Sequence, residues 1–158
     1  MKEIVAFGGH IVIVDDEDYE LFSRYKWHLT NGYAIRHRNE NGKHVGWHLM
    51  HRDIMHANTE QQIDHINHNK LDNRKENLRF ATVRQNGCNQ LPQTGCSSKY
   101  KGVCWSKWAN KWQAQIKNKG RRIYLGLYDT EERAAQAYNL AAKNFFGEYA
   151  YLNRGMQL

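Results

Sequence analysis

Residues 62–90, QIDHINHNKLDNRKENLRFATVRQNGCNQ, decide the expected fold, because they set an acid, histidines and several asparagines between two short apolar runs. Residues 63–66 read as one strand, 67–75 as a polar loop and 77–81 as a second strand, in which Phe80 is expected to be buried. This part of the stretch therefore predicts a hairpin with a long loop.

A short helix is predicted after the hairpin. Thr82 and Gln85 fit a capping box, in which the hydroxyl and the amide satisfy backbone groups at a helix start. A helix over residues 83–90 would carry Asn86 and Asn89 on one face. The whole stretch thus predicts strand, loop, strand and helix.

Asp64, His65 and Asn86 are the parts of a hydrolytic metal site for phosphodiesters. A hard cation such as Mg²⁺ prefers oxygen ligands, which Asp64 and the side-chain oxygen of Asn86 supply. His65 is left for another task, because an imidazole is largely neutral near pH 7 and can take a proton from an attacking water. Neighbours on an ideal strand point to opposite faces, so Asp64 and His65 share a site only if the strand bends or ends there.

Each of these residues also has a plainer interpretation. Asn77 alone is a common turn residue, and a single asparagine on a helix, such as Asn86, is rarely a ligand. His65 and His68 could form half of a zinc site, but structural zinc usually takes four ligands dominated by cysteine, and there is no C-x-x-C pair. The joint spacing favours the nuclease interpretation.

That spacing, with Asn77 twelve residues after His65 and Asn86 nine further on, resembles the H-N-H motif of ββα-metal endonucleases, in particular phage-type homing endonucleases. The text LDNRKENLRFAT at residues 71–82 is equally typical of that family. The resemblance implies that His65 is the general base, that Asp64 and Asn86 hold Mg²⁺ or Mn²⁺, and that Asn77 fixes the loop that aims His65.

Residues 1–47 read as β-rich, with hairpin turns at Gly8-Gly9 and Asn41-Gly42 and with Trp27 and Trp47 expected in the core. Residues 49–56 predict a short packing helix that carries His51. A histidine on such a helix is more often structural than catalytic, so His51 is a weak site candidate. A similar histidine-arginine pair precedes the motif in phage endonucleases of this kind, and the resemblance therefore places this helix in the nuclease domain.

The 158 residues suffice for one ordinary domain or two small ones, and the mixed composition with one proline argues against disorder. No apolar run approaches the length of a membrane span, and the amino end lacks a signal-peptide pattern. We therefore expect a cytoplasmic protein of a bacterial cell, encoded by a phage or mobile element. The three cysteines suit free thiols in a reducing compartment.

Positive charge is confined to one part of the chain. Residues 1–98 contain 12 Lys plus Arg and 12 Asp plus Glu, whereas residues 99–158 contain 11 and 4, which accounts for the net charge of +7. Residues 99–122 hold eight basic side chains, no acid and three tryptophans. This pattern is typical of a nucleic-acid surface, with a solvated charged face as the alternative.

Beyond residue 98, three strands are predicted at 100–105, 112–117 and 122–128, followed by an alanine-rich helix that stops at Gly147. Strand alternation puts Ile123, Leu125 and Leu127 on a buried face under the helix. The opposite face would present Gln115, Lys117, Arg122 and Tyr124 to a partner. A two- or three-stranded ribbon of this kind fits the major groove of B-DNA.

The text YKGVCWSKWANKWQAQI and its continuation closely resemble the AP2/ERF DNA-binding domain across residues 100–153. The family's contact positions fall here on Lys101, Gly102, Trp108, Gln115, Lys117, Arg122 and Tyr124. Three departures stand out: Lys101 and Lys117 replace the arginines usual in plant members, Cys104 replaces a contacting arginine, and Tyr124 replaces a tryptophan. Lysine is a point charge rather than a bidentate fork, so the target sequence should differ.

The predicted architecture is α+β: a β-rich segment and ββα-metal nuclease core in residues 1–90, a linker at 91–98, a domain at 99–153 with a three-stranded antiparallel sheet on one helix, and a tail at 154–158. No membrane and no small-molecule cofactor are expected.

The predicted function is a sequence-specific, metal-dependent endonuclease that hydrolyses double-stranded DNA and is targeted by its AP2 domain. A basic residue near the motif, Arg79 or Arg84, could steady the phosphate, although solvation is the plainer role for either. One site cuts one strand, so a monomer would nick and a homodimer would be needed for a double-strand break; the choice stays open. The alternatives are a regulatory DNA-binding protein with a lapsed nuclease site and an HNH restriction-type defence enzyme.

Overall fold

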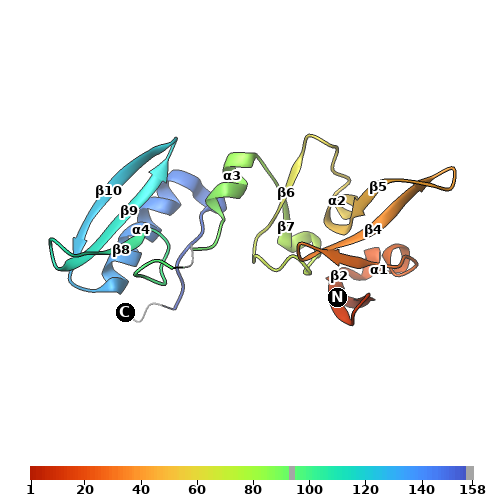
Figure 1. Cartoon of the computed structure of the whole chain (residues 1–158), viewed down its shortest axis with the longest axis horizontal. Helices are drawn as coiled ribbons and strands as arrows, with labels where there is room; N and C mark the ends of the chain where they lie inside the picture. Colours follow the sequence, from red (N-terminus) through yellow and green to blue (C-terminus); the bar gives the residue numbers. More distant parts are fainter. Residues whose placement is uncertain (93–94, 156–158) are drawn as a thin grey trace. The chain divides into compact units, whose positions relative to one another are not determined.

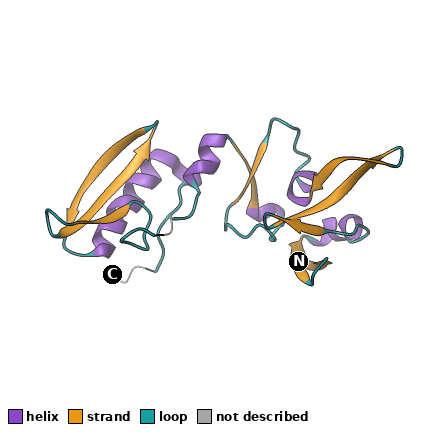
Figure 2. Cartoon of the chain, viewed as in Figure 1, coloured by secondary structure: helices purple, strands orange, loops and turns teal. Residues whose placement is uncertain are grey.

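The computed structural model describes residues 1–92 and 95–155 and contains two compact units, unit 1 (Met1–Asn86) and unit 2 (Gly87–Leu158). Both units combine helices with small antiparallel sheets, which confirms the predicted α+β class (Figures 1 and 2). Two residues of the predicted linker, 93–94, and most of the predicted tail, 156–158, lie outside the described residues.

Unit 1 begins with an antiparallel hairpin of β1 (Lys2–Ala6) and β2 (His10–Val14), followed by α1 (Asp16–Phe22). The hairpin turns at Gly8 and Gly9, which have φ of 84° and 78°. That left-handed conformation costs glycine little, because it has no Cβ. The predicted turn at this position is confirmed.

A second sheet contains β3 (His28–Thr30), β4 (Tyr33–Glu40) and β5 (Lys43–Leu49), in that order. Both connections are Asn-Gly turns with positive φ at each residue, as tight hairpin turns require. Strand β3 was not predicted. The prediction that Trp47 is in the core is wrong: it is 49% exposed, because its ring packs against His37 and His44 on the surface of the β4–β5 hairpin.

The decisive stretch forms the elements in the predicted order. After α2 (Met50–Ile54) come β6 (Gln62–His65), the 3-10 turn η1 (Lys75–Asn77), β7 (Leu78–Ala81) and α3 (Val83–Cys88). Strands β6 and β7 pair antiparallel. Phe80, predicted to be buried, is 42% exposed, because the apolar core reaches Leu78 and Ile63 and stops short of Phe80.

The core of unit 1 joins the amino-terminal strands to the β6–β7 hairpin. Its buried members come from β1, β2, α1, β4, α2, β6 and β7 and the loop before β3: Ile4, Ala6, Val12, Val14, Phe22, Trp27, Ala34, Met50, Ile54, Ile63 and Leu78. The loop before β7 also bonds to β2, since Ile13 donates to the Leu71 carbonyl and accepts from the Asn73 amide, each at 2.8 Å. The β-rich segment is therefore the scaffold that fixes the loop after β6.

Unit 2 contains one sheet and one long helix. Strands β8 (Val103–Ser106), β9 (Lys111–Asn118) and β10 (Arg121–Tyr128) form an antiparallel sheet in the order β10-β9-β8, and α4 (Glu131–Phe146) covers one face before the 3-10 turn η2 (Gly147–Tyr149) (Figure 1). Three fully buried alanines of α4 let the helix lie close to the sheet: Ala134, Ala135 and Ala142.

One face assignment in unit 2 is wrong. The register of β10 against β9 shifts between Tyr124 and Gly126, so that Leu125 is an extra residue in the strand. Beyond this bulge Leu127 pairs with Gln113 and Tyr128 with Trp112. Tyr128, rather than the predicted Leu127, therefore packs with Leu125 in the core.

None of the helices within residues 1–92 and 95–155 has the length and apolar character needed to cross a bilayer.

Candidate active site and DNA-binding face

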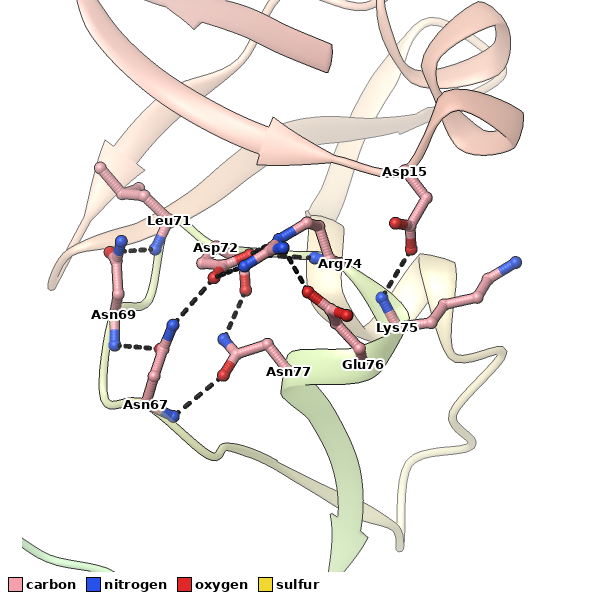
Figure 3. A network of polar contacts seen from close by, with 9 residues as sticks. All are labelled: Asp15, Asn67, Asn69, Leu71, Asp72, Arg74, Lys75, Glu76 and Asn77. Carbon is pink, nitrogen blue, oxygen red and sulfur yellow. Dashed lines mark hydrogen bonds and ion pairs between the residues drawn. The ribbon is translucent and has the colours of Figure 1, made fainter. Parts of the chain in front are cut away.

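The loop between β6 and β7 is held by a network of asparagine side chains (Figure 3). Asn77 Oδ1 accepts from the Asn67 amide at 2.9 Å, and Asn77 Nδ2 donates to the Asp72 carbonyl at 2.8 Å. Asn67 Oδ1 in turn accepts from the Asn69 amide at 2.8 Å. Asn77, which is buried, therefore ties the end of the loop to its beginning, directly after His65.

Asp72 closes the same loop from its centre. Arg74 donates from Nε to Asp72 Oδ1 and from Nη2 to Oδ2, both at 2.8 Å, and Asn67 Nδ2 donates to Oδ2 at 2.8 Å. The hydrogen bonds from Arg74 hold the pKa of Asp72 below its usual value. Because both oxygens accept bonds, this buried carboxylate acts as a structural clasp for the loop.

His65 is the last residue of β6 and is only 5% exposed. Its ring lies 5.1 Å from that of His51 and 5.9 Å from that of Tyr33, between centroids. Burial lowers the pKa of the imidazole below its usual value, and the neighbouring Asn73 side chain and Asp64 carboxylate offset this only in part. His65 is therefore a neutral imidazole at pH 7, in the form that accepts a proton.

His51 lies on α2 with its ring in edge-to-face contact with His65 and 5.0 Å from Tyr33. Burial lowers its pKa to about 3, with a smaller contribution from charge on His65. Its Nδ1 is buried and has no hydrogen-bond partner among residues 1–92 and 95–155. The weak sequence candidate thus lies beside the proposed base, as a second neutral imidazole.

Asp64 is also buried, and its cross-strand partner Arg79 donates to it twice. Nε and Nη2 of Arg79 lie 2.9 and 2.7 Å from Asp64 Oδ2. Asp64 and His65 are the last two residues of strand β6, so they lie where the strand ends; that both side chains serve one site stays a prediction.

Asn86 is half-buried on α3. The predicted capping box is present at the start of this helix: Gln85 Oε1 accepts from the Thr82 amide at 2.8 Å, and Thr82 Oγ1 accepts from the Gln85 amide at 3.2 Å. The Asn86 amide donates to the Thr82 carbonyl at 2.9 Å, so the asparagine lies one turn into the helix.

The oxygen donors fit a hard divalent cation in kind, because a carboxylate and an amide oxygen are the ligands that Mg²⁺ takes alongside water and phosphate. The buried Asp64 carboxylate is paired with Arg79 in this structure, so its charge does not by itself require a metal ion. Over residues 1–92 and 95–155 there is no group of three or more His, Cys, Asp or Glu placed to hold a metal ion. Such a group would be needed for the alternative zinc site.

In unit 2, polar side chains gather on the face of the sheet opposite α4. Lys117 pairs with Arg122, and Gln115 pairs with Tyr124 on the neighbouring strand. Lys117 and Arg122 are exposed, and Tyr124 is 60% exposed. The four side chains make a patch two residues long and two strands wide.

Two family models match the chain: an HNH endonuclease model over residues 59–88 and an AP2 domain model over residues 98–148. A protein of Acanthamoeba polyphaga mimivirus, named as an uncharacterized HNH endonuclease, is 35% identical in an alignment of 153 positions that covers 92% of this chain and 76% of the relative. The chain belongs to the HNH endonuclease family.

Plant transcription factors match only the second unit of this HNH endonuclease. An AP2-like ethylene-responsive transcription factor of Arabidopsis thaliana is 43% identical over 67 residues, and dehydration-responsive element-binding protein 2D of the same plant is 46% identical over 59. Each match covers 36% of this chain, and 22% and 28% of the two plant proteins. The protein thus has a nuclease domain followed by an AP2 domain, and both domains indicate DNA binding.

Lys101 and Gly102 of this HNH endonuclease have structural contacts of their own. The Lys101 ammonium donates to the carbonyls of Cys88 and Gln90 at 2.9 and 2.6 Å. Gly102 has φ of 76°, and a Cβ there would lie 2.1 Å from the Tyr138 ring. Trp108, by contrast, is 84% exposed and is available to a partner.

Tyr33 lies beside His65 without having been predicted there, and Arg79, considered before only as a possible phosphate contact or a solvated residue, pairs with Asp64. Nothing in the local sequence of Tyr33 points to His65, because the two come from separate hairpins. Arg79 had a usable signal: pairing the two predicted strands antiparallel sets it opposite Asp64. Its side chain is paired and only 12% exposed, so the plain solvated role considered for it is wrong.

Proposed function

We propose that this protein is a homing-type DNA endonuclease in which the AP2 domain selects the site and the nuclease domain hydrolyses one phosphodiester bond. The single observation that carries the proposal is the placement of His65: a neutral, buried imidazole directly after the Asp64 carboxylate, at the start of a loop that Asn77 ties shut. The order of β6, β7 and α3 supports a ββα-metal core.

His65 takes a proton from a water molecule, and the water oxygen forms a bond to phosphorus while the bond from phosphorus to the 3′ oxygen breaks. The departing 3′ oxygen takes a proton from solvent, so the products are a 5′ phosphate and a 3′ hydroxyl, and the imidazolium later returns its own proton to solvent. Asp64 and Asn86 would hold a Mg²⁺ or Mn²⁺ ion, which would supply positive charge beside the phosphate and the departing 3′ oxygen.

Asn77 acts as a positioning residue for this step. Its two bonds fix the backbone of the loop that begins after His65, so the imidazole keeps one orientation. A base that is already held in position does not have to reorganise when the phosphate binds. Avoiding that reorganisation lowers the barrier and raises the rate of cleavage.

The AP2 sheet docks in the major groove and positions the enzyme. Gln115, Lys117, Arg122 and Tyr124 are the contacts on the open face, and Trp108 adds an exposed aromatic ring. Lysine and arginine recognise guanine and phosphate, and glutamine recognises adenine. Gly102 supports the sheet from within, and Lys101 reaches DNA only if its ammonium leaves the carbonyls that it now contacts.

The test is incubation of a supercoiled plasmid that carries the uninterrupted host locus with Mg²⁺ or Mn²⁺. Wild type should convert it to nicked circles, and His65→Ala should be slower by about 100-fold or more, because proton transfer by a positioned base contributes that much. His10→Ala removes an exposed histidine at the start of β2 and should cut at the wild-type rate.

Binding of that DNA by wild type without nicking or cutting, under any divalent metal, would refute the enzyme proposal and favour a regulatory DNA-binding protein. Equal rates for wild type and His65→Ala would refute the assignment of the base.

A further inference from the structure

Arg79 lies on the very carboxylate that the proposed mechanism uses to hold a cation. Its Nε and Nη2 both donate to Asp64 Oδ2, at 2.9 and 2.7 Å. The side chains of Arg79 and Asp64 are 12% and 6% exposed. In the metal-free protein a guanidinium therefore neutralises this buried carboxylate.

The second buried carboxylate of unit 1, Asp72, also pairs with an arginine, but it lies within the loop between β6 and β7 and holds that loop closed through Arg74. Asp64, by contrast, is the residue before the proposed base, and its partner Arg79 comes from the neighbouring strand. The Asp72 pair therefore holds a loop, whereas the Arg79 pair occupies the proposed metal ligand.

We propose that Arg79 neutralises Asp64 until a divalent cation and DNA bind, and that its guanidinium then turns to the scissile phosphate. This inference rests on the proposed function, because it uses Asp64 as the metal ligand. Two cations at one carboxylate repel each other, so the entry of the metal ion displaces the guanidinium. A phosphate offers the displaced guanidinium two oxygens, which matches its forked donors.

The Arg79 guanidinium has only a short distance to move from Asp64 to the phosphate. The phosphate has to contact the cation held by Asp64 and lie next to the water activated by His65, the residue after Asp64. Any phosphate in that position is within reach of a guanidinium that now contacts Asp64 itself. Arg79 is then a catalytic residue that contacts the substrate, and in the free protein it competes with the cation.

Competition between Arg79 and the metal ion for Asp64 predicts an effect that a purely structural ion pair would not produce. Removing the guanidinium should tighten binding of the metal ion to the DNA-free protein while slowing cleavage. We expect Arg79→Gln to bind Mn²⁺ at least about threefold more tightly, since the carboxylate loses a competing positive charge. Single-turnover cleavage at saturating Mn²⁺ should fall about 100-fold, because a donor to the charged phosphate is lost.

The experiment measures Mn²⁺ binding to the full chain by electron paramagnetic resonance without DNA, and cleavage separately. The gain in affinity should vanish in Arg79→Gln with Asp64→Asn, which shows that it depends on that carboxylate. Arg36→Gln is the matched control, because Arg36 donates from Nη2 to Asp53 Oδ2 at 3.3 Å and its loss removes the same charge from another ion pair. It should leave Mn²⁺ affinity unchanged.

Arg79→Lys keeps a positive charge without the fork, and its Mn²⁺ affinity should fall between wild type and Arg79→Gln; it also serves if the glutamine variant fails to fold. Unchanged or weaker Mn²⁺ binding in a folded Arg79 variant would overturn the inference. If wild type nicks DNA but a folded Arg79 variant shows unchanged or weaker Mn²⁺ binding, the inference about Arg79 is refuted and the proposed function stands. Tighter binding in Arg79→Gln with no nicking by wild type would refute the proposed function alone.

Discussion

The polar side chains around His65 in unit 1 are buried, whereas those on the open face of the unit 2 sheet are exposed. His51, Asp64, His65, Asp72, Asn73 and Asn77 are all buried, and Asn67, Arg74 and Arg79 contact members of this group. Lys117, Arg122 and Tyr124 stand on adjacent strands and face outward. A group that moves a proton needs a fixed surrounding, whereas a group that meets DNA needs access.

Charge and histidine content also differ between the two units. Unit 1 balances 12 basic with 12 acidic residues, and unit 2 has 11 basic and 4 acidic. All nine histidines lie within the first 68 residues, so unit 2 has none. We therefore expect the stability of unit 1 to depend on pH and DNA binding by unit 2 to depend on salt. Experiments on each property can contradict this difference between the units.

The largest expected effect is on the stability of unit 2 alone. Gly102→Ala would put a Cβ 2.1 Å from the Tyr138 ring and 2.5 Å from the Gln115 carbonyl oxygen, at a φ of 76°. We expect a loss of about 3 kcal/mol or more in the free energy of unfolding of unit 2, because backbone and core must both shift. Thermal unfolding of the full chain, followed by tryptophan fluorescence and circular dichroism, measures it.

Gly120→Ala is the control, since Gly120 has φ of 79° but open space around the added Cβ. It should cost only about 1 kcal/mol, the usual strain of a left-handed residue. An equal loss in both variants would show that the close contact with Tyr138 is unimportant, and a change in the unit 1 transition would show that the units do not unfold separately.

A smaller effect is expected from acid, in unit 1. The pKa of His51 is lowered to about 3 and that of His65 is also lowered, so the unfolded chain binds protons near pH 6.5 that the folded unit does not. The contribution of these two histidines to the free energy of unfolding is therefore fully present above pH 6.5 and decreases as the pH drops below it. Because of His51 alone, the free energy of unfolding of unit 1 should fall by about 2 kcal/mol between pH 6.5 and pH 5, at about 1.4 kcal/mol per pH unit.

Denaturant unfolding of the metal-free protein at pH 7 and at pH 5 tests this. His51→Gln should remove part of the pH dependence, and unit 2 should show none from histidine over that range. If unit 1 were equally stable at both values, the two imidazoles would have to be accessible to protons in the folded state.

The smallest effect concerns the proposed DNA-binding face. Lys117→Ala with Arg122→Ala should weaken binding of target DNA about tenfold and lower the slope of log affinity against log salt by up to about 2, because each lost phosphate contact releases about one counterion fewer. Fluorescence anisotropy at several salt concentrations measures both quantities. Lys143→Ala with Arg133→Ala, on α4 behind the sheet, is a charge-matched control. Unchanged affinity in the first pair would mean that the wrong face had been chosen.

Local patterns in the sequence predicted much of this fold. The capping box at Thr82, the Asn41-Gly42 turn and the three strands and helix of unit 2 follow from short-range rules, and the structure has each of them. Those signals are local because caps and turns depend on residues a few positions apart. The sequence leaves open whether Asp64 and His65 share one site, because neighbours on a strand point to opposite faces; strand β6 contains both residues and ends at His65.

Long-range packing accounts for what the sequence did not reveal. Tyr33 meets His65 because two hairpins fold over one core, and no spacing along the chain encodes that contact. Exposure of Trp47 and Phe80 depends on where the core ends, which alternation alone does not define. The burial of His51, and with it the shift of its pKa, arises from the same tertiary packing.

The bulge at Leu125 changes which positions of β10 are open to redesign. A substitution at position 127 would appear on the open face beside Gln113, whereas the same substitution at position 125 or 128 would disturb the core. Anyone redesigning this face must count the extra residue before assigning the far end of β10 to a side of the sheet. A design based on strict alternation would place every side chain beyond Gly126 on the wrong side of the sheet.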